Sequence, residues 1–260
     1  MLLATWNVNS LRARLPRVLD WLATRSPDVV AMQETKCTPE NLPRAELEAA
    51  GYEVAHAGVS QWNGVAVLSK VGLTDVEVGF PAVPAFEGAV ESRALGATCG
   101  GVRVWSLYVP NGRVPDGPHY EYKLTWLAAL RDAAADWRQT APELPTALVG
   151  DFNIAPTDED VWDIAVFAES THVTAPERAA FAALVDTGYA DVVRPFTPGP
   201  GAYTYWDYQR LRFAHREGMR IDFVLGSPAL QARVTGARVD RDARKGKGPS
   251  DHAPVLVELT

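Results

Sequence analysis

The sequence predicts an α/β (α+β) fold in which two mixed β-sheets pack face to face and helices cover their outer faces. Strand-like apolar runs occur from end to end of the 260-residue chain. They are too many for one sheet, and most are joined by short turns. A hydrophobic content of 47% is enough for a large core. Because no Ser/Gly linker or fixed-period repeat divides the chain, residues 1–260 are predicted to form one domain.

The N-terminal part is predicted to alternate strands and helices. Two apolar runs predict strands, Leu2–Asn9 and Asp28–Met32. Apolar residues at helical spacing predict a helix over Arg14–Thr24, which Ser26-Pro27 ends because a residue before proline avoids the α region. Thr38-Pro39-Glu40 joins a capping hydroxyl to a proline at the first helical position, which predicts a second helix to about Ala50.

The middle of the chain is predicted to hold half of the strands and the longest helix. Six segments predict strands: Tyr52–Ala57, Gly64–Lys70, Leu73–Val78, Leu95–Cys99, Val102–Val109 and Thr146–Val149. Gly100-Gly101 predicts a tight hairpin, and residues 79–92 are expected to form a loop. A stripe at helical spacing predicts a helix over His119–Arg138, with Leu124, Leu127, Leu130 and Ala134 facing inward.

The last third is predicted to contain one helix and several strands. The helix is expected over Pro176–Asp186, after a polar loop at 154–160, and is closed by Gly188. Four strands are expected: Ala202–Trp206, Arg220–Leu225, Val234–Asp240 and Val255–Leu259. Residues 209–216 are interpreted as a loop with basic side chains.

Cysteine content and hydropathy indicate a cytoplasmic protein without membrane contact. Cys37 and Cys99 are too few for a disulfide framework, which is typical of a reducing compartment. The N-terminus has no basic region of a signal peptide, and no run approaches the ~18 apolar residues of a membrane helix. Nothing in the sequence demands an oligomer, so a monomer is expected.

The charge is distributed unevenly along the chain. The net charge is −7, but residues 194–247 contain eleven Lys/Arg and five Asp/Glu, a local balance of +6. The remainder carries −13. A polyanion responds to the local basic face, because more distant charges are screened. A solvated basic surface without a partner is the alternative, and the charge count does not separate the two.

The segment Ala147–Asn153 ends a short apolar run with two polar residues. Pro145 and Gly150 bound the run, and Asp151 and Asn153 follow it. If the backbone stays extended, residues two apart point to the same side. Asp151 could then accept a proton from a water molecule that Asn153 holds in place.

Other buried runs end in the same kinds of residue. Asn7, with Asn9 two positions later, Glu34 and Asp251 all follow apolar segments. Each has an ordinary interpretation, such as a turn residue or, for Glu34, a partner for Lys36. Together they predict a cation site, because a buried carboxylate is costly unless it is paired. The ligands are oxygens and no Cys/His cluster has zinc spacing, so Mg²⁺ or Mn²⁺ is implied.

His252 is the one histidine of the five that we expect to function chemically. Ser250-Asp251-His252 does not suit a nucleophilic triad, because sequence neighbours cannot easily line up in those roles. We expect His252 to pair with Asp222, which would raise its pKa so that the ring meets an anion as imidazolium. Tyr108 ends a strand and, taken alone, is best interpreted as a packing residue. Together these groups suit hydrolysis of a phosphoester.

Six stretches in this order resemble a known family. They are Thr5-Trp6-Asn7-Val8-Asn9, Gln33-Glu34-Thr35-Lys36, Tyr108-Val109-Pro110-Asn111, Gly150-Asp151-Phe152-Asn153, Arg220-Ile221-Asp222 and Ser250-Asp251-His252. The set is similar to the exonuclease III group of abasic-site (AP) endonucleases, within the endonuclease/exonuclease/phosphatase (DNase I-like) superfamily. The resemblance implies a four-layer α/β sandwich, which agrees with the independent prediction.

The resemblance also implies roles for individual residues. Glu34 resembles the main metal ligand, with Asn7, Asn9 and Asp251 in or near the metal shell, although some relatives have aspartate at the position of Asn9. Asp151 and Asn153 resemble the pair that activates and places water. The remaining matches resemble phosphate contacts or their supports: Tyr108, His252, Asp222, Lys36 and Asn111.

The same resemblance implies a pocket for a flipped, base-less sugar. Its apolar wall would consist of Tyr205, Trp206, Met219 and Ile221, although many relatives have tryptophan at the position of Met219. Three arginines between these residues are expected to contact DNA: Arg210, Arg212 and Arg216.

The predicted function is that of a Mg²⁺-dependent DNA repair phosphodiesterase, a hydrolase of base excision repair. It would cut double-stranded DNA 5′ to abasic sites and remove nucleotides or blocking groups from 3′ ends. Two alternatives remain at this point. One is a superfamily enzyme for another phosphoester, such as RNA, an inositol phosphate or a phospholipid head group. The other is a non-catalytic DNA-binding protein.

Overall fold

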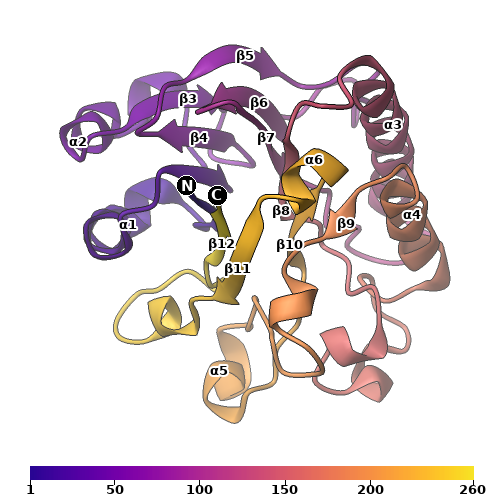
Figure 1. Cartoon of the computed structure of the whole chain (residues 1–260). Coiled ribbons are helices and arrows are strands. Elements are labelled where there is room, and N and C mark those ends of the chain that lie inside the picture. The colour runs from indigo at the N-terminus through magenta and orange to yellow at the C-terminus, as the bar shows by residue number, and fades with distance from the viewer.

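The computed structural model describes residues 1–260 and contains two six-stranded sheets (Figure 1). Sheet A has the order β11 (Val234–Val239), β12 (Val255–Leu259), β1 (Leu2–Asn7), β2 (Val29–Gln33), β4 (Val65–Ser69), β3 (Glu53–Ala57). Sheet B has the order β5 (Thr74–Val78), β6 (Ala94–Cys99), β7 (Val102–Tyr108), β8 (Thr146–Asp151), β10 (Asp222–Gly226), β9 (Ala190–Asp191). Both sheets are mixed, because β1–β2 and β7–β8 are parallel and the other pairs are antiparallel.

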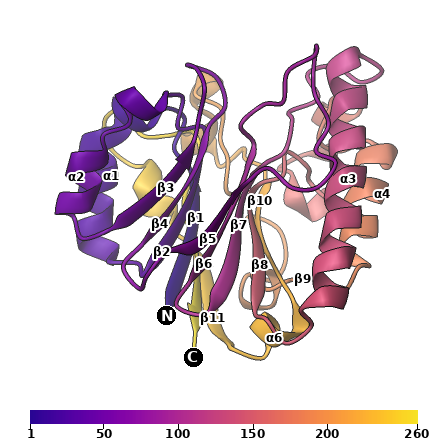
Figure 2. The ribbon, with the colours of Figure 1, turned by 90° about the horizontal axis from the view of Figure 1, so that it is seen from above.

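Helices complete four layers. Figure 2 shows α1 (Leu11–Arg25) and α2 (Arg44–Ala49) outside sheet A, and α3 (Pro118–Thr140) and α4 (Ala175–Val185) outside sheet B. Two further helices have one turn each, α5 (Arg212–His215) and α6 (Pro228–Gln231). Six 3₁₀ turns lie at Pro39–Asn41, Asp158–Asp160, Ile164–Phe167, Arg194–Phe196, Gln209–Leu211 and Arg241–Arg244. The predicted four-layer sandwich is confirmed. None of the helices has the length and apolar character needed to span a membrane.

Strand alternation divides the core into three layers. Along β1, Leu3 faces the other sheet, whereas Ala4 and Trp6 face α1 and α2. Along β8, Val149 faces the other sheet, whereas Leu148 faces α3 and α4. Side chains two residues apart on a strand point to the same face. The polar residues Asn7 and Asp151, at the ends of β1 and β8, therefore point into the space between the two sheets, as Leu3 and Val149 do. The mouth between the two sheets is therefore the place where the strand-end polar residues meet.

The register of sheet B aligns three of these residues. Asp151 at the end of β8 lies opposite Tyr108 of β7 on one side and opposite Asp222 of β10 on the other. The preceding residue, Gly150, has a φ of 143°, and a Cβ there would lie 1.9 Å from the carbonyl oxygen of Leu107. Only glycine allows the neighbouring strand to approach this closely.

Most predicted elements are present, although the helices differ in detail. The helix predicted from Thr38 is divided into a 3₁₀ turn and α2, because Pro43 lacks an N–H and restricts the residue before it. The first helix begins earlier, at Leu11, where the Ser10 hydroxyl accepts a hydrogen bond from the Ala13 N–H. Leu124 is only half-buried, because the inward face of α3 runs through Trp126, Leu127 and Leu130.

The strand predicted over Ala202–Trp206 is wrong. Only Tyr205 forms isolated bridges, one with Met219 and one with His252. Consecutive residues of this segment bond to different parts of the chain: the Tyr205 N–H donates to the Met219 carbonyl, and the Trp206 N–H donates to the Asp251 carbonyl. The loop predicted over 209–216 contains the one-turn helix α5.

Candidate active site

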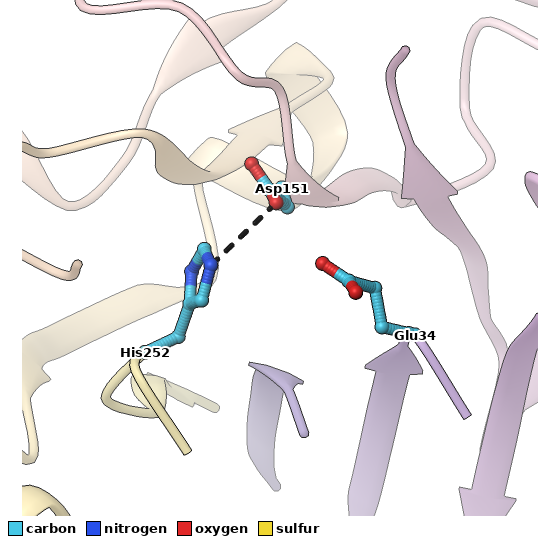
Figure 3. Close-up of side chains that lie close together, drawn as sticks. All are labelled: Glu34, Asp151 and His252. Carbon is cyan, nitrogen blue, oxygen red and sulfur yellow. Dashed lines mark ion pairs between the residues drawn. The ribbon is translucent and has the colours of Figure 1, made fainter. Parts of the chain in front are cut away.

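Three side chains from distant parts of the chain converge at the mouth between the sheets. Glu34, Asp151 and His252 each offer one potential metal-ligand atom, and these three atoms lie within 4.8 Å of one another. Figure 3 shows the two carboxylates and the imidazole pointing into the same space. Glu34 follows β2, Asp151 ends β8 and His252 precedes β12, so both sheets contribute to the cluster.

Left-handed backbone at the strand ends places several of these groups. Asn9, Glu34 and Asn153 have φ values of 42°, 52° and 51°. The assumption of an extended backbone at Asn7–Asn9 and Asp151–Asn153 is therefore wrong. Instead, the Asn153 N–H donates to Asp151 Oδ1 at 2.9 Å, and the Asn9 N–H donates to Asn7 Oδ1 at 3.0 Å. Such turns suit Asn and Asp, which tolerate the left-handed region and bond to their own backbone.

Asn7 joins the two carboxylates. Its Nδ2 donates to Glu34 Oε1 at 2.8 Å and to Asp151 Oδ2 at 2.9 Å. Because carboxylate oxygens accept hydrogen bonds, these contacts fix the orientation of the amide. The amide oxygen is turned away toward Asn9. Asn7 therefore orients the acidic groups and directs no oxygen at the space between them.

Lys36 and Asn9 form the rim of the cluster. Lys36 Nζ lies 2.8 Å from Glu34 Oε2 and donates to Asn9 Oδ1 at 2.6 Å. Asn9 Nδ2 in turn donates to Asp251 Oδ1 at 3.0 Å. Burial alone would raise the pKa of Glu34, but Lys36 and the Asn7 amide lower it below its ordinary value. Asp251 lies on this rim and outside the group formed by Glu34, Asp151 and His252.

His252 is held between two carboxylates. The predicted pairing with Asp222 is present, with Nδ1 2.8 Å from Asp222 Oδ2, while Nε2 lies 3.8 Å from Asp151 Oδ2. Burial opposes the charged ring, but Asp222 and Asp151 outweigh it and raise the pKa of His252 to about 10. Burial raises the pKa of Asp151 above its ordinary value. An imidazolium has no free lone pair for a metal, so His252 suits an anion.

Asn153 meets two side chains beyond the strand ends. Its Nδ2 donates to the Val109 carbonyl oxygen at 3.0 Å, so its Oδ1 faces Asn111 Nδ2 at 3.1 Å and His172 Nε2 at 3.2 Å. Burial and the nearby Lys123 ammonium lower the pKa of His172, which keeps the ring neutral. The sequence interpretation did not select His172, because the segment around it contains no motif that predicts this contact.

Tyr108 lies beside Asp151, and its ring contacts the guanidinium of Arg93, a residue that the sequence interpretation missed. The Arg93 guanidinium is 4.6 Å from the Tyr108 ring centroid and is itself buried. Burial and the charge of Glu34 hold the pKa of Tyr108 well above its ordinary value, so its hydroxyl remains a hydrogen-bond donor. Arg93 occurs in a segment without a recognisable pattern, and only the pairing of strands reveals the contact.

The chemistry of the cluster fits a hard divalent cation. Glu34 and Asp151 provide carboxylate oxygens in a largely buried site, where unpaired negative charge is costly. Oxygen ligands suit Mg²⁺ and Mn²⁺, and the protonated His252 leaves the ligand set all oxygen. These two carboxylates are therefore the groups that could hold such an ion.

A hollow beside the Tyr205 ring is lined by two of the four residues predicted for the sugar pocket, Tyr205 and Met219. The Tyr205 ring lies 4.9 Å from the His252 ring, and Tyr205 and Met219 line a cavity of about 210 Å³. The cavity is also lined by Trp162 and Phe167, which the sequence interpretation missed. Both come from the turn-rich segment after β8, where no local pattern marks them.

Trp206 and Ile221 do not line this hollow. Trp206 is 1% exposed and packs with Tyr203 and Ala253 in a separate cluster, because adjacent residues project to different sides. Ile221 is 2% exposed and packs with Ala155 and other apolar side chains behind the wall. These two of the four predicted wall residues therefore lie outside this hollow.

Many basic side chains of the segment 194–247 are already engaged by other groups of the protein. Arg212 pairs with Glu217 and lies over the Trp162 ring at 4.9 Å. Arg194 and Arg220 pair with the buried Asp160, Arg238 forms a surface pair with Glu258, and Arg244 donates to backbone carbonyls. Arg210 and Arg216 are exposed at the ends of left-handed turns. The basic surface is therefore smaller than the charge count suggests.

Comparisons with known proteins agree with this geometry. The family described as "Endonuclease/Exonuclease/phosphatase family" matches residues 4–252. Exodeoxyribonuclease III of Haemophilus influenzae is 29% identical over 98% of this chain and 98% of its own length. Among solved structures, a 3′ phosphatase from Neisseria bound to a product DNA hairpin is 39% identical, with a TM-score of 0.94 over 100% of this chain and 99% of that one. An AP endonuclease from Archaeoglobus fulgidus is 32% identical, with a TM-score of 0.92 and the same coverage.

Proposed function

The chain belongs to the endonuclease/exonuclease/phosphatase family, and we propose that it is a metal-dependent nuclease that hydrolyses phosphoester bonds in double-stranded DNA. The observation that carries the proposal is the convergence of Glu34, Asp151 and the Asp222-paired His252 in one buried cluster. A cation site and an imidazolium side by side suit a phosphate that gains charge during hydrolysis.

Two activities are proposed for the same site. The first is removal of nucleotides or blocking groups from 3′ ends, and it is supported by a relative described as a 3′ phosphatase and another described as exodeoxyribonuclease III. The second is a cut 5′ to an abasic site, supported by the relative described as an AP endonuclease. We place 3′-end removal first because the 3′ phosphatase has the higher identity, 39% against 32%.

We propose the following roles in the reaction. Asp151 accepts the proton of the attacking water, because the Asn7 amide and the Asn153 N–H fix the positions of its two carboxylate oxygens. The water oxygen forms a bond to phosphorus while the opposite phosphoester bond breaks. The imidazolium of His252 and the hydroxyl of Tyr108 donate to the phosphate oxygens, and Asn111 and Lys36 border them.

Mg²⁺, with Mn²⁺ as a substitute, would be held by Glu34 and Asp151, with Asn9 and Asp251 on the rim. When bound, the ion supplies positive charge that offsets the charge developing on the phosphate. Tyr205 and Met219, beside His252, would accommodate the sugar next to the reacting phosphate. Arg210 and Arg216 are free to contact the DNA backbone.

A gel experiment tests the proposal. The purified protein is incubated with a duplex carrying one abasic-site analogue, a duplex with a recessed 3′ end and a matched RNA, each with Mg²⁺ and with a chelator. Mg²⁺-dependent shortening of the recessed end, and a single cut beside the analogue, are expected. Asp151→Asn keeps the shape and removes the base, so it should lose on the order of 100-fold or more in kcat.

Other outcomes favour the alternatives. Cleavage of RNA alone would favour a different phosphoester substrate, and inactivity on every nucleic acid would direct attention to phosphate head groups. Binding of DNA that strengthens when Glu34 and Asp151 are neutralised, without turnover by the wild-type protein, would favour a non-catalytic DNA-binding protein.

We also infer that residues 1–260 act as one domain and as a monomer in the cytoplasm. Support comes from the shared inter-sheet core, which draws residues from both sheets, and from the two buried, unpaired cysteines, which suit a reducing compartment. Size-exclusion chromatography with light scattering tests the monomer.

A further inference from the structure

Behind the active site, α3 and α4 are joined by an ion pair that the roles proposed above do not use. Lys123 Nζ lies 2.5 Å from Glu177 Oε1, and both side chains have no exposed surface. Apolar residues of similar volume usually replace such a pair without loss of stability, because removing two charges from water is costly. Stability alone is therefore a poor explanation for a lysine and a glutamate at these positions.

The other protons of the Lys123 ammonium reach two segments of the active site. Nζ donates to the main-chain carbonyl of Asn153 at 2.6 Å and to that of Asn111 at 3.1 Å. These are the two residues whose carboxamides meet at 3.1 Å in the site. The three protons of the ammonium are directed at Glu177, Asn111 and Asn153, and the Thr171 hydroxyl is a longer contact at 3.4 Å.

Glu177 holds a third segment, Thr171–Thr174, which precedes α4. Its Oε1 accepts from the His172 N–H at 2.9 Å and lies 2.6 Å from the Thr171 hydroxyl, while its Oε2 accepts from the Thr174 N–H at 3.1 Å. The carboxylate therefore caps the start of α4 and fixes the residues just before it. This arrangement keeps the His172 ring 3.2 Å from Asn153 Oδ1.

These segments lie beyond the ends of their strands, where no sheet ladder can hold them. β7 ends at Tyr108 and β8 at Asp151, before Asn111 and Asn153. Asn153 and His172 have left-handed φ values of 51° and 85°, as Gly112 has with 95°. A Cβ on Gly112 would lie 2.5 Å from the Thr171 hydroxyl, which shows how closely the segments pack.

We propose that Lys123 and Glu177 are positioning residues of the active site, which hold Asn111, Asn153 and His172 in one arrangement through their main-chain atoms. The proposal rests on the proposed function, in which the Asn153 N–H holds an oxygen of the base Asp151 and Asn111 borders the phosphate. Hydrogen bonds to charged groups are stronger than those between neutral groups, which suits an ion pair to this task. Catalysis is sensitive to such placement, since an error of about 1 Å can cost about 100-fold in rate.

The test separates positioning from stability with a double variant. Lys123→Met leaves Glu177 buried without a partner and should lower both the Tm and kcat. Lys123→Met combined with Glu177→Met removes both charges and should recover part of the Tm lost in the single variant, although the α4 cap is lost, while kcat on the recessed 3′ end stays about 100-fold below wild type. We expect KM to change by much less than kcat. Recovery of kcat to the wild-type value in the double variant would overturn the proposal.

Lys123→Arg provides a conservative comparison, because a guanidinium keeps the charge and several donors. It should retain more activity than Lys123→Met. Arg194→Met is a matched control, since Arg194 also joins a buried carboxylate, Asp160, to two loop carbonyls, those of Thr197 and Gly199. These carbonyls belong to no site residue, so the control should lower the Tm without a comparable loss of kcat.

A structural measurement keeps the test independent of turnover. In a crystal structure of the double variant, the contact between Asn111 Nδ2 and Asn153 Oδ1 should lengthen beyond its present 3.1 Å. An unchanged contact would overturn the proposal even if the single variant did not fold. An inactive wild-type protein would refute the proposed function, whereas an active one with full activity in the double variant would refute the positioning role alone.

Discussion

His252 shows how one residue acquires its charge from its surroundings. Its Nδ1 meets Asp222 and its Nε2 faces Asp151, while its backbone carbonyl accepts from the Trp6 indole at 3.1 Å. Ring orientation and ring charge therefore depend on three segments of the chain. Because its pKa is raised to about 10, His252 remains an imidazolium across the physiological range.

Replacing Asp222 should move the alkaline limit of activity. Without its nearest carboxylate, the pKa of His252 falls from about 10 toward its ordinary value, so the imidazolium is lost at a lower pH. Asp222→Asn should therefore lower kcat by about 100-fold and shift the alkaline decline to lower pH, as a pH–rate profile measures. An unshifted decline would mean that another group sets this limit.

His119 should limit stability in acid. Its Nδ1 accepts from the Gly112 N–H at 3.1 Å, which requires a neutral ring, and burial and nearby arginines lower its pKa to about 4. The folded state binds a proton at His119 less readily than the unfolded state does. The free energy of unfolding is therefore unaffected by His119 above pH 6.5 and decreases as the pH falls from 6.5 toward 4.

We expect His119→Gln to reduce this loss by on the order of 2 kcal/mol over the same range. Urea unfolding at pH 7 and pH 4.5 measures it. His215, which is exposed, provides the control, because His215→Gln should leave the difference between the two pH values unchanged. An equal loss in the His119 variant and the wild type would exclude His119 as the source.

At the scale of elements, β8 is the strand that organises the site. It lies between β7 and β10, and its last residue, Asp151, is in register with Tyr108 and Asp222. The close approach of β7 depends on Gly150, where any side chain would meet the Leu107 carbonyl. Residues that follow β8 no longer belong to the ladder, so their positions depend on side-chain hydrogen bonds.

Gly150→Ala should destabilise the protein strongly. The new Cβ would lie 1.9 Å from a backbone oxygen, so β7 and β8 must separate. We expect a loss of about 3 kcal/mol, measured by thermal unfolding as a fall in Tm of roughly 6–12 °C. Gly72→Ala is the matched control, because Gly72 has a positive φ of 88° but nothing within 4 Å of its Cβ position. Equal effects would attribute the loss to backbone conformation alone.

At the scale of the whole molecule, the candidate metal site joins the two sheets. Glu34 comes from the end of a strand in sheet A and Asp151 from a strand in sheet B, and only Asn7 hydrogen-bonds to both. An ion held by the two carboxylates would bind the folded chain and not the unfolded one. Metal binding should therefore appear as added stability of the entire fold.

Mg²⁺ should raise the Tm of the wild-type protein. At about 100 times its dissociation constant, a ligand adds about 2.7 kcal/mol, which corresponds to roughly 5–10 °C for a chain of this size. A chelator should reverse the increase, and Glu34→Gln should abolish it. An equal increase in the Glu34→Gln variant would place the ion elsewhere.

The sequence by itself determined the architecture and the central chemistry. Apolar runs with local turn residues predicted nearly all of the strands and the main helices, because these depend on neighbours in the chain. Asn7, Glu34, Asp151 and His252 could be selected because each follows or precedes a buried strand. Their meeting follows from sheet geometry, which brings strand ends to one edge.

Only the tertiary structure decided which other groups meet there. Trp206 faces away from the hollow, the basic segment is largely paired internally, and His172 and Lys123 belong to the surroundings of Asn153. Left-handed residues at the strand ends break the alternation on which the sequence prediction relied. Contacts between segments far apart in the chain then select the side chains, and no local pattern encodes those contacts.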